Sequence, residues 1–300
     1  MAKRKNKKVT ANRNYKDTVF RKLFSDRRNL LSLYNAINGT AYTDETKLEI
    51  VTLENAIYMG MKNDLAFIID TNLFLYEHQS TYNPNMPLRD LFYISSEYQK
   101  LVDRKSLYSS ILLKLPAPNF IVFYNGKRKM PDRWTNCLSE SYENQQGDPN
   151  LELKVVTINI NSDCNRKLME QCRILGEYAQ YVEKVRKNAE TMSLDVAVKE
   201  AVDECIQKGI LADFLRVNRA EVIAMSIFEY DKEEEEQKLQ ATYEKIGEKR
   251  GIQIGEKQGE LKKAKSIAIS LAQEGESVER IARILGETEK TIKEWLAETH

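Results

Sequence analysis

Long hydrophobic runs are missing from this sequence of 300 residues. No stretch approaches the roughly 18 to 20 apolar residues that a helix needs to cross a membrane. The N-terminal residues Met-Ala-Lys-Arg-Lys-Asn-Lys-Lys are followed by no apolar segment of the kind found in secretory signals. We therefore expect no membrane-spanning segment and a cytoplasmic location.

Cysteine and histidine are scarce. The sequence has 4 Cys and 2 His, and no two cysteines form a Cys-x-x-Cys pair. A structural zinc site needs such ligands close together, and a disulfide framework needs several paired cysteines. The composition argues against both for the residues concerned, which are Cys137, Cys164, Cys172, Cys205, His78 and His300.

An excess of charge of either sign is also missing, because 46 Lys and Arg balance 45 Asp and Glu to give a formal net charge of +1. The overall charge therefore neither favours nor excludes nucleic acid as a partner. The charges are unevenly placed, and a basic, flexible leader occupies residues 1–14. This leader is either a phosphate-contacting arm or a solvated tail.

The pattern of apolar residues predicts an α/β domain over residues 15–165. Helical spacing comes first, and β-branched and aromatic segments follow it. A further amphipathic helix and two buried strands come after a proline-containing loop. The predicted elements are helical residues 15–38, strands 64–69 and 73–79 around a turn at 70–72, helix 88–102, and strands 119–124 and 153–160.

Only helical patterns follow, so the C-terminal region is predicted to be all-α. Residues 166–230 carry apolar stripes, and residues 231–263 are charged, with a glycine at every fourth position from Gly247 to Gly259. The glycines indicate either a close helix–helix contact or a flexible linker. Residues 264–300 resemble a helix-turn-helix of three short helices, which is either an assembly module or a DNA reader. We expect a homo-oligomer formed through this C-terminal region.

Polar side chains gather on the predicted hairpin. If residues 71–72 form its two-residue loop, Asp64 lies opposite Gln79 and Ala66 lies opposite Glu77. Cross-strand neighbours are only about 5 Å apart. The polar groups of the two strands are therefore expected to share one small area of the sheet.

Alternation along the second strand puts Glu77 and Gln79 on one face and turns His78 toward the core. The carboxylates of Asp64 and Glu77 then repel each other unless a cation lies between them. Mg²⁺, or Mn²⁺ in its place, prefers such oxygen ligands, polarises a bound phosphate and lowers the pKa of a bound water. The alternative is that Asp64 only opens a strand and that Glu77 and Gln79 face solvent.

Several segments carry a resemblance to a known protein family. The central one runs from Lys62-Asn63-Asp64 through Glu77-His78-Gln79-Ser80-Thr81 to Arg89, and residues 17–24, 120–126 and 247–259 add to it. The chain resembles the Rpn family of recombination-promoting nucleases, which belongs to the PD-(D/E)XK superfamily. The resemblance covers most of the chain. It implies a PD-(D/E)XK restriction-endonuclease-like core with a role in recombination of mobile elements or in phage defence.

The resemblance also implies roles for individual residues. Asp64 matches the first metal-binding acid of the family and Glu77 the second, so both are expected to hold Mg²⁺. Gln79 stands where most of the superfamily has lysine, and a neutral amide can only orient groups by hydrogen bonds. Lys62 and Lys100 are the candidates for the missing positive charge.

Two further residues are auxiliary candidates. Asp17, on the first predicted helix, is either a third metal ligand or water-positioning group, or an N-cap or solvent-facing acid. Arg89, which opens the helix after the motif, either holds a phosphate or forms an ordinary ion pair. The sequence thus predicts a metal-dependent DNA endonuclease. The alternative is an oligomeric DNA-binding or interaction protein that keeps the fold without effective catalysis.

Overall fold

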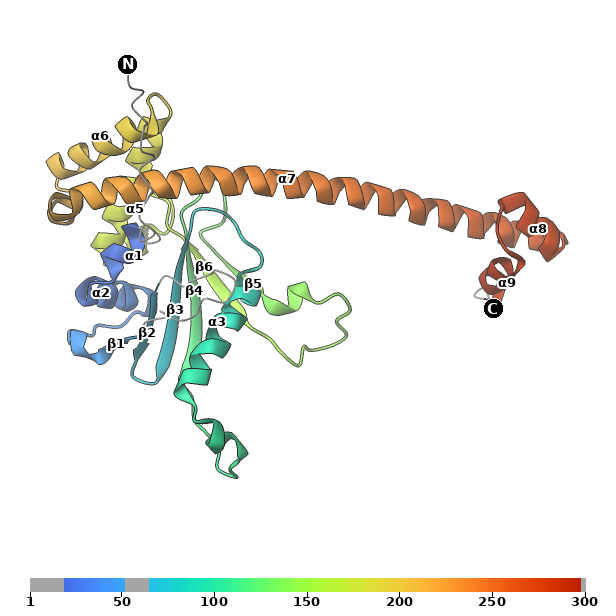
Figure 1. Ribbon diagram of the computed structural model, residues 1–300, viewed down its shortest axis with the longest axis horizontal. Helices are drawn as coiled ribbons and strands as arrows, with labels where there is room; N and C mark the ends of the chain where they lie inside the picture. The colour runs from blue at the N-terminus through green and yellow to red at the C-terminus, as the bar shows by residue number, and fades with distance from the viewer. Residues whose placement is uncertain (1–18, 52–64, 298–300) are drawn as a thin grey trace, which may run out of the picture. The chain divides into compact units, whose positions relative to one another are not determined.

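The computed structural model describes residues 19–51 and 65–297 of the chain. The chain divides into two compact units, residues 1–234 and residues 235–300. The first unit is a mixed α/β structure, as predicted, and the second is helical (Figure 1). Within the described residues, no helix combines the length and the apolar character that spanning a membrane requires.

A six-stranded sheet lies at the centre of the first unit, in the order β1-β2-β3-β4-β6-β5. Strands β1, β2 and β3 pair antiparallel, β3, β4 and β6 run parallel, and β5 pairs antiparallel with β6. The carboxyl ends of the parallel strands therefore meet at one edge of the sheet. The strands are β1 (Leu48–Ile50), β2 (Leu65–Ile69), β3 (Asn72–Gln79), β4 (Ala117–Tyr124), β5 (Arg133–Cys137) and β6 (Lys154–Asn159).

Two of these strands were not expected from the sequence. Strand β1 has only three residues, which is too short for an apolar alternation to show. Strand β5 reads Arg-Trp-Thr-Asn-Cys and lies at the edge of the sheet, where only one of its residues is buried. An edge strand has one neighbour and needs no continuous apolar face. The predicted strands 119–124 and 153–160 are confirmed as β4 and β6.

The register predicted for the hairpin is wrong by two residues. Ile69 pairs with Asn72, so the loop is formed by Asp70 and Thr71, and Ala66 lies opposite Leu75 instead of Glu77. Asp70 has a φ of 52°, a left-handed conformation that aspartate tolerates better than most residues. The Tyr42 hydroxyl also donates a hydrogen bond of 2.7 Å to the Asp70 carboxylate.

One face of the sheet is covered by helices from both ends of the first unit (Figure 1). Helices α1 (Val19–Phe24) and α2 (Arg27–Asn38) pack there with residues of the later helices. Those later helices are α4 (Arg166–Gln171), α5 (Arg173–Ala189), α6 (Leu194–Gln207) and the beginning of α7 (Ala212–Gln273). The helical residues 166–230 thus share one hydrophobic core with the strands, and its fully buried side chains include Phe20, Phe67, Tyr76, Phe123, Leu175, Val202 and Leu215.

The other face of the sheet is covered by α3 (Met86–Leu101), which connects the parallel strands β3 and β4 (Figure 1). Pro87 lies in the first turn of α3, where its missing N–H leaves no hydrogen bond unmade. Alternate residues of β3 face this helix, as shown by the packing of Leu73 and Leu75 against Tyr93 and Ile94. The predicted helix 88–102 is confirmed.

The second unit has a small core of its own. The end of α7 packs with α8 (Val278–Leu285) and α9 (Glu289–Ala297) around Ala268, Ile281, Ala282, Ile292 and Trp295. Ser277 accepts a hydrogen bond from the Arg280 backbone N–H and caps α8, and Gly286 ends α8 with a φ of 71°. The glycines from Gly247 to Gly259 lie within helix α7. The sequence predicted three short helices here; the last two are confirmed as α8 and α9, and the first is the end of the long helix α7.

Candidate functional site

Glu77 and Gln79 lie side by side at the end of β3. The side-chain Nε2 of Gln79 donates a hydrogen bond of 2.9 Å to Glu77 Oε1, and Glu77 is buried, with 4% exposed. His78 points to the opposite face, where its ring stacks on Phe20 and its Nε2 lies 3.1 Å from the Tyr178 hydroxyl. The predicted alternation is confirmed, and Glu77 does not face solvent.

The guanidinium of Arg89, on α3, contacts Glu77 from the side of the helix. Its Nη2 donates to Glu77 Oε1 at 2.7 Å and to the Tyr93 hydroxyl at 3.2 Å. The Arg89 side chain is 21% exposed and that of Glu77 is 5% exposed, so the ion pair is largely removed from water. The sequence left open whether Arg89 forms an ion pair, and the structure shows one.

The electrostatics of this cluster follow from burial and from the charge of Glu77. Burial acts to lower the pKa of Arg89, but the charges of Glu77, Tyr93 and Asp90 outweigh it and raise the pKa above its ordinary value. Burial raises the pKa of Tyr93 to about 12, and the charge of Glu77 adds to the shift. At neutral pH Arg89 is therefore a cation and Tyr93 a neutral hydrogen-bonding group.

Asp90, the neighbour of Arg89, was not among the predicted site residues. It is 2% exposed, and its Oδ1 has no hydrogen-bond partner within the described residues. Burial raises the pKa of this carboxyl from 3.8 to about 7, against a smaller opposing effect of Arg89. Met86, Asp90 and Ile94 are spaced at four-residue intervals, so helical periodicity alone would have placed Asp90 on the buried face of α3.

Aromatic rings lie beside Gln79 at the same edge of the sheet. Trp134 of β5 lies 6.3 Å from the Tyr82 ring and 5.5 Å from the Tyr124 ring, and the Arg128 guanidinium lies 5.4 Å from the Tyr82 centroid. The hollow between the three aromatic rings and Gln79 has a volume of about 10 Å³, roughly the room of a single water. Because the sequence of β5 is mostly polar, it did not predict a strand here or the position of Trp134.

Of the remaining predicted residues, the structure describes Lys100 alone, and it lies away from this cluster. Lys100 forms a 2.7 Å ion pair with the buried Glu97. It lies eleven residues beyond Arg89 on α3, about 16 Å along the helix axis. Asp17, Lys62 and Asp64 lie outside the described residues. Within the described part of the chain, no group of three or more His, Cys, Asp or Glu side chains could hold a metal ion.

We compared the chain with protein-family models, with curated proteins and with solved structures, and found no match in any of the three. The resemblance to the Rpn nucleases therefore stays a prediction from the quoted motifs. The arrangement of side chains at the end of β3 therefore provides the information on function that does not depend on this resemblance.

Proposed function

We propose that this protein is a metal-dependent DNA endonuclease with a PD-(D/E)XK-like core. One observation carries the proposal: Glu77 and Gln79 are adjacent on one face of β3, at the edge where the parallel strands end. The order of hairpin, helix α3 and parallel strand β4 around them is consistent with such a core. Because side chains alternate along the strand, the carboxylate of Glu77 and the amide of Gln79 lie on the same face and can contact one bound ligand.

The donor set fits Mg²⁺ in its chemistry. The Glu77 carboxylate and the Gln79 amide oxygen are hard oxygen ligands, which Mg²⁺ prefers. A second carboxylate would come from Asp64, which directly precedes Leu65 in the chain, and Leu65 pairs with Tyr76, the residue before Glu77. The bound ion would polarise the scissile phosphate and acidify a water.

Arg89 would balance charge in this reaction. Without a cation, its guanidinium compensates the buried Glu77 carboxylate at 2.7 Å. Once a divalent ion takes over that task, we expect Arg89 to turn to a phosphate oxygen, for which its planar donors are well suited. Gln79 would orient Glu77 through its hydrogen bond, because a neutral amide cannot supply the charge of a lysine.

The test is cleavage of supercoiled plasmid in Mg²⁺, Mn²⁺, Ca²⁺ or EDTA. We expect nicking or linearisation in Mg²⁺ or Mn²⁺, lost in EDTA and reduced at least about 100-fold in Asp64→Ala and in Glu77→Gln. Glu97→Gln is the matched control, because Glu97 is also buried and paired with a cation but lies away from the cluster. Equal cleavage by wild type and both site variants would show that any nuclease site lies elsewhere.

A non-catalytic DNA-binding protein is the second candidate, favoured by the pairing of Glu77 with both Gln79 and Arg89. The same experiment separates the two functions. DNA retardation in a gel without new strand ends under any metal condition would support the second candidate.

Self-association through residues 235–300 belongs to both proposals. Ile246, Ile252 and Ile254 are 40%, 56% and 56% exposed on α7, on the segment that carries the glycines. Exposed isoleucines beside glycines offer an apolar surface that a second helix could approach closely.

A further inference from the structure

The connection between α3 and β4, residues 102–116, is longer than the path between these elements requires. The last turn of α3 already lies beside the start of β4, because the Tyr98 hydroxyl donates a hydrogen bond of 2.7 Å to the Pro116 carbonyl oxygen. Connections between helices and strands in α/β units usually take about 2 to 6 residues. Residues 102–116 therefore form an additional segment, called the arm below, which extends away from the sheet before the chain returns to β4 (Figure 1).

The arm exposes large apolar side chains to solvent. Four of them, in the middle of the arm, are between 64% and 93% exposed: Leu107, Tyr108, Ile111 and Leu112. Within the described residues, no large apolar side chain of the arm is buried. Apolar side chains gathered on a surface in this way mark interaction sites of soluble proteins.

Local hydrogen bonds hold the arm in shape without covering these side chains. The short 3₁₀ helix η2 (Arg104–Tyr108) begins after Asp103, whose carboxylate accepts a hydrogen bond of 3.4 Å from the Lys105 backbone N–H. The Ser109 hydroxyl accepts one of 3.3 Å from the Ile111 backbone N–H. Because the arm is already ordered by these contacts, a partner that binds it has to restrict less backbone freedom.

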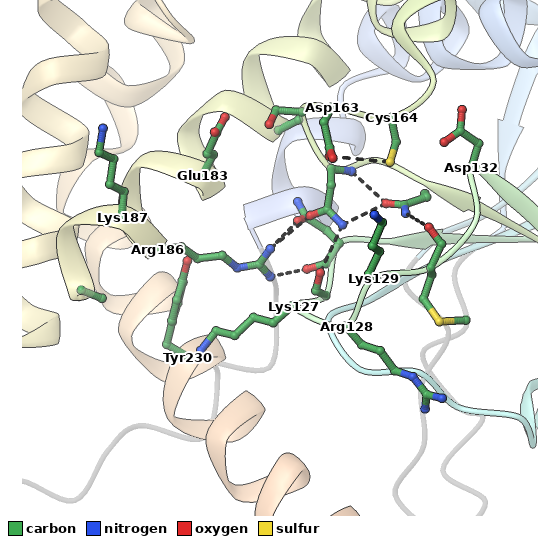
Figure 2. A pocket seen from close by; sticks show the side chains of 18 of the residues that line it. Lys127, Arg128, Lys129, Asp132, Asp163, Cys164, Glu183, Arg186, Lys187 and Tyr230 are labelled. Atoms are coloured by element: carbon green, nitrogen blue, oxygen red, sulfur yellow. Dashed lines mark hydrogen bonds between the residues drawn. The ribbon is translucent and has the colours of Figure 1, made fainter.

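A large pocket in the same unit does not suit the arm as a docking site. The pocket opens beside Asn125, at the carboxyl ends of β4 and β6, and has a volume of about 1050 Å³ (Figure 2). Charged side chains line it, among them Lys127, Asp163, Glu183 and Lys187. Leucine and tyrosine side chains placed there would take these charges out of water without giving them partners. The arm therefore needs an apolar partner surface.

The charges of the arm fit a second copy of the same segment. Asp103 lies at its beginning and Lys114 at its end, and neither forms an ion pair with a residue that the structure describes. In a two-fold contact the same surface meets itself, so opposite ends of two antiparallel arms face each other. Asp103 of each copy then lies near Lys114 of the other. Charges of both signs do not match an anionic membrane surface, which attracts clusters of cations.

The size and composition of the apolar surface also suit a dimer. One partner in a standard protein–protein interface buries about 800 Å², and a single tyrosine supplies about 150 to 250 Å². On the arm, Tyr108 is accompanied by four further exposed side chains, Leu107, Ile111, Leu112 and Leu115. Interface cores are typically rich in aromatic residues and poor in charge. Two arms together therefore offer a surface of the order that a stable contact requires.

We propose that the arm is a dimerisation element that packs against the arm of a second copy of this chain. This contact is separate from the self-association of residues 235–300. The arm leads into the amino end of β4, whereas Glu77 lies near the carboxyl end of β3, which runs parallel to β4. Dimerisation through the arm therefore leaves the cluster around Glu77 accessible and does not depend on hydrolysis there.

The first test is sedimentation velocity on the full chain over a range of protein concentrations. Tyr108→Ser with Leu112→Ser should weaken the association step made by the arm at least about 100-fold, because each copy loses two apolar side chains from the contact. Val217→Ser with Leu151→Ser is the matched control, since both side chains are exposed outside the arm. The control should associate as wild type does. Thermal unfolding checks that both double variants are folded.

A further variant separates the arm from residues 235–300. If both surfaces associate, wild type forms assemblies larger than a dimer, and Ile246→Ser with Ile254→Ser on α7 removes the contact of residues 235–300. We expect a dimer to remain in this variant. Adding the two arm substitutions to it should then give a monomer.

Cysteine crosslinking tests where the contact lies. Ser110 is exposed in the middle of the arm, so a short bismaleimide should join two copies of Ser110→Cys. Ser141→Cys, exposed in the connection between β5 and β6, is the control. Wild type gives the background from Cys137 and Cys164, which are partly exposed. The crosslinked dimer should disappear when the two arm substitutions are added.

Three outcomes would overturn the proposal. One is a wild-type chain that is monomeric at every concentration. Another is equal association in wild type and in the arm variant, with no crosslinking of Ser110→Cys above background. The third is a monomer that binds vesicles of phosphatidylglycerol and phosphatidylcholine and loses this binding with the arm substitutions, which would assign the arm to a membrane surface.

Discussion

Arg89 and Arg186 lie on opposite faces of the sheet near the carboxyl ends of its parallel strands, and their guanidiniums donate to different kinds of acceptor. Arg89 donates to the buried Glu77 carboxylate. Arg186 donates to two asparagine side chains and one backbone oxygen. A carboxylate compensates the charge of a guanidinium, whereas amide oxygens only orient it. The Arg89 pair thus neutralises a buried charge, whereas the hydrogen bonds of Arg186 join α5 to the residues that follow β4 and β6.

The largest expected loss of stability comes from replacing Arg89, and replacing Arg186 in the same way gives the comparison. Arg89→Met should lower the free energy of unfolding by about 3 to 4 kcal/mol, because it leaves the buried Glu77 carboxylate without its cation. Arg186→Met should cost about 1 to 2 kcal/mol through the hydrogen bonds to Asn125 and Asn161 that it removes. Urea unfolding at neutral pH measures both, and equal losses would contradict the comparison.

Asp90, the buried acid next to Arg89, provides a further test at the cluster around Glu77. Its pKa rises from 3.8 to about 7 on folding. The folded state therefore keeps a proton that the unfolded state releases, and this contribution makes stability fall as pH rises from about 4 to about 7.

Asp90→Asn should remove that pH dependence and raise the free energy of unfolding by about 4 kcal/mol at pH 8. The gain should shrink toward zero near pH 4. Thermal or urea unfolding of wild type and variant across this range measures it. A gain that does not change with pH would show that Asp90 does not titrate in this window.

Gly126 packs against Ser80, the residue after Gln79, and directly follows Asn125, which contacts Arg186. Its substitution should therefore disturb both the cluster around Glu77 and the contacts of Arg186. Gly126→Ala places a Cβ against the Ser80 carbonyl oxygen and the Tyr124 hydroxyl, and should cost about 1 to 2 kcal/mol. It should also disturb the contact of Arg186 with Asn125, because Asn125 is the preceding residue. Gly251→Ala is the control: nothing lies within 4 Å of its Cβ position, and alanine favours a helix by up to about 1 kcal/mol.

Several features of the candidate site could be predicted because they follow local rules. Strand alternation placed Glu77 with Gln79 and turned His78 away, and the structure confirms both. The hairpin register could not be predicted the same way, since it depends on which residue takes the left-handed turn position. Asp70 takes it and is held by Tyr42, a residue far away in sequence.

The hydrogen-bond partners of Arg89 and Arg186 cannot be predicted from local sequence patterns. Arg186 contacts Asn125 across 61 residues of sequence, and no periodicity connects them. Arg89 was a candidate from its motif, but its contact with Glu77 requires α3 to cross from β3 to β4 over that face of the sheet. The sequence did not predict Trp134 as a residue near the site, because an edge strand such as β5 has little apolar pattern.

The sequence by itself determined the mixed α/β class, most of the strands and helices, and the faces on which side chains of β3 lie. These depend on side-chain period and capping, which act within a few residues. Only the tertiary structure decided the hairpin register, the burial of Asp90, the partner of each arginine and the pocket beside Asn125. These depend on how segments far apart in sequence pack together, because packing determines which groups lose water and which acceptors they reach.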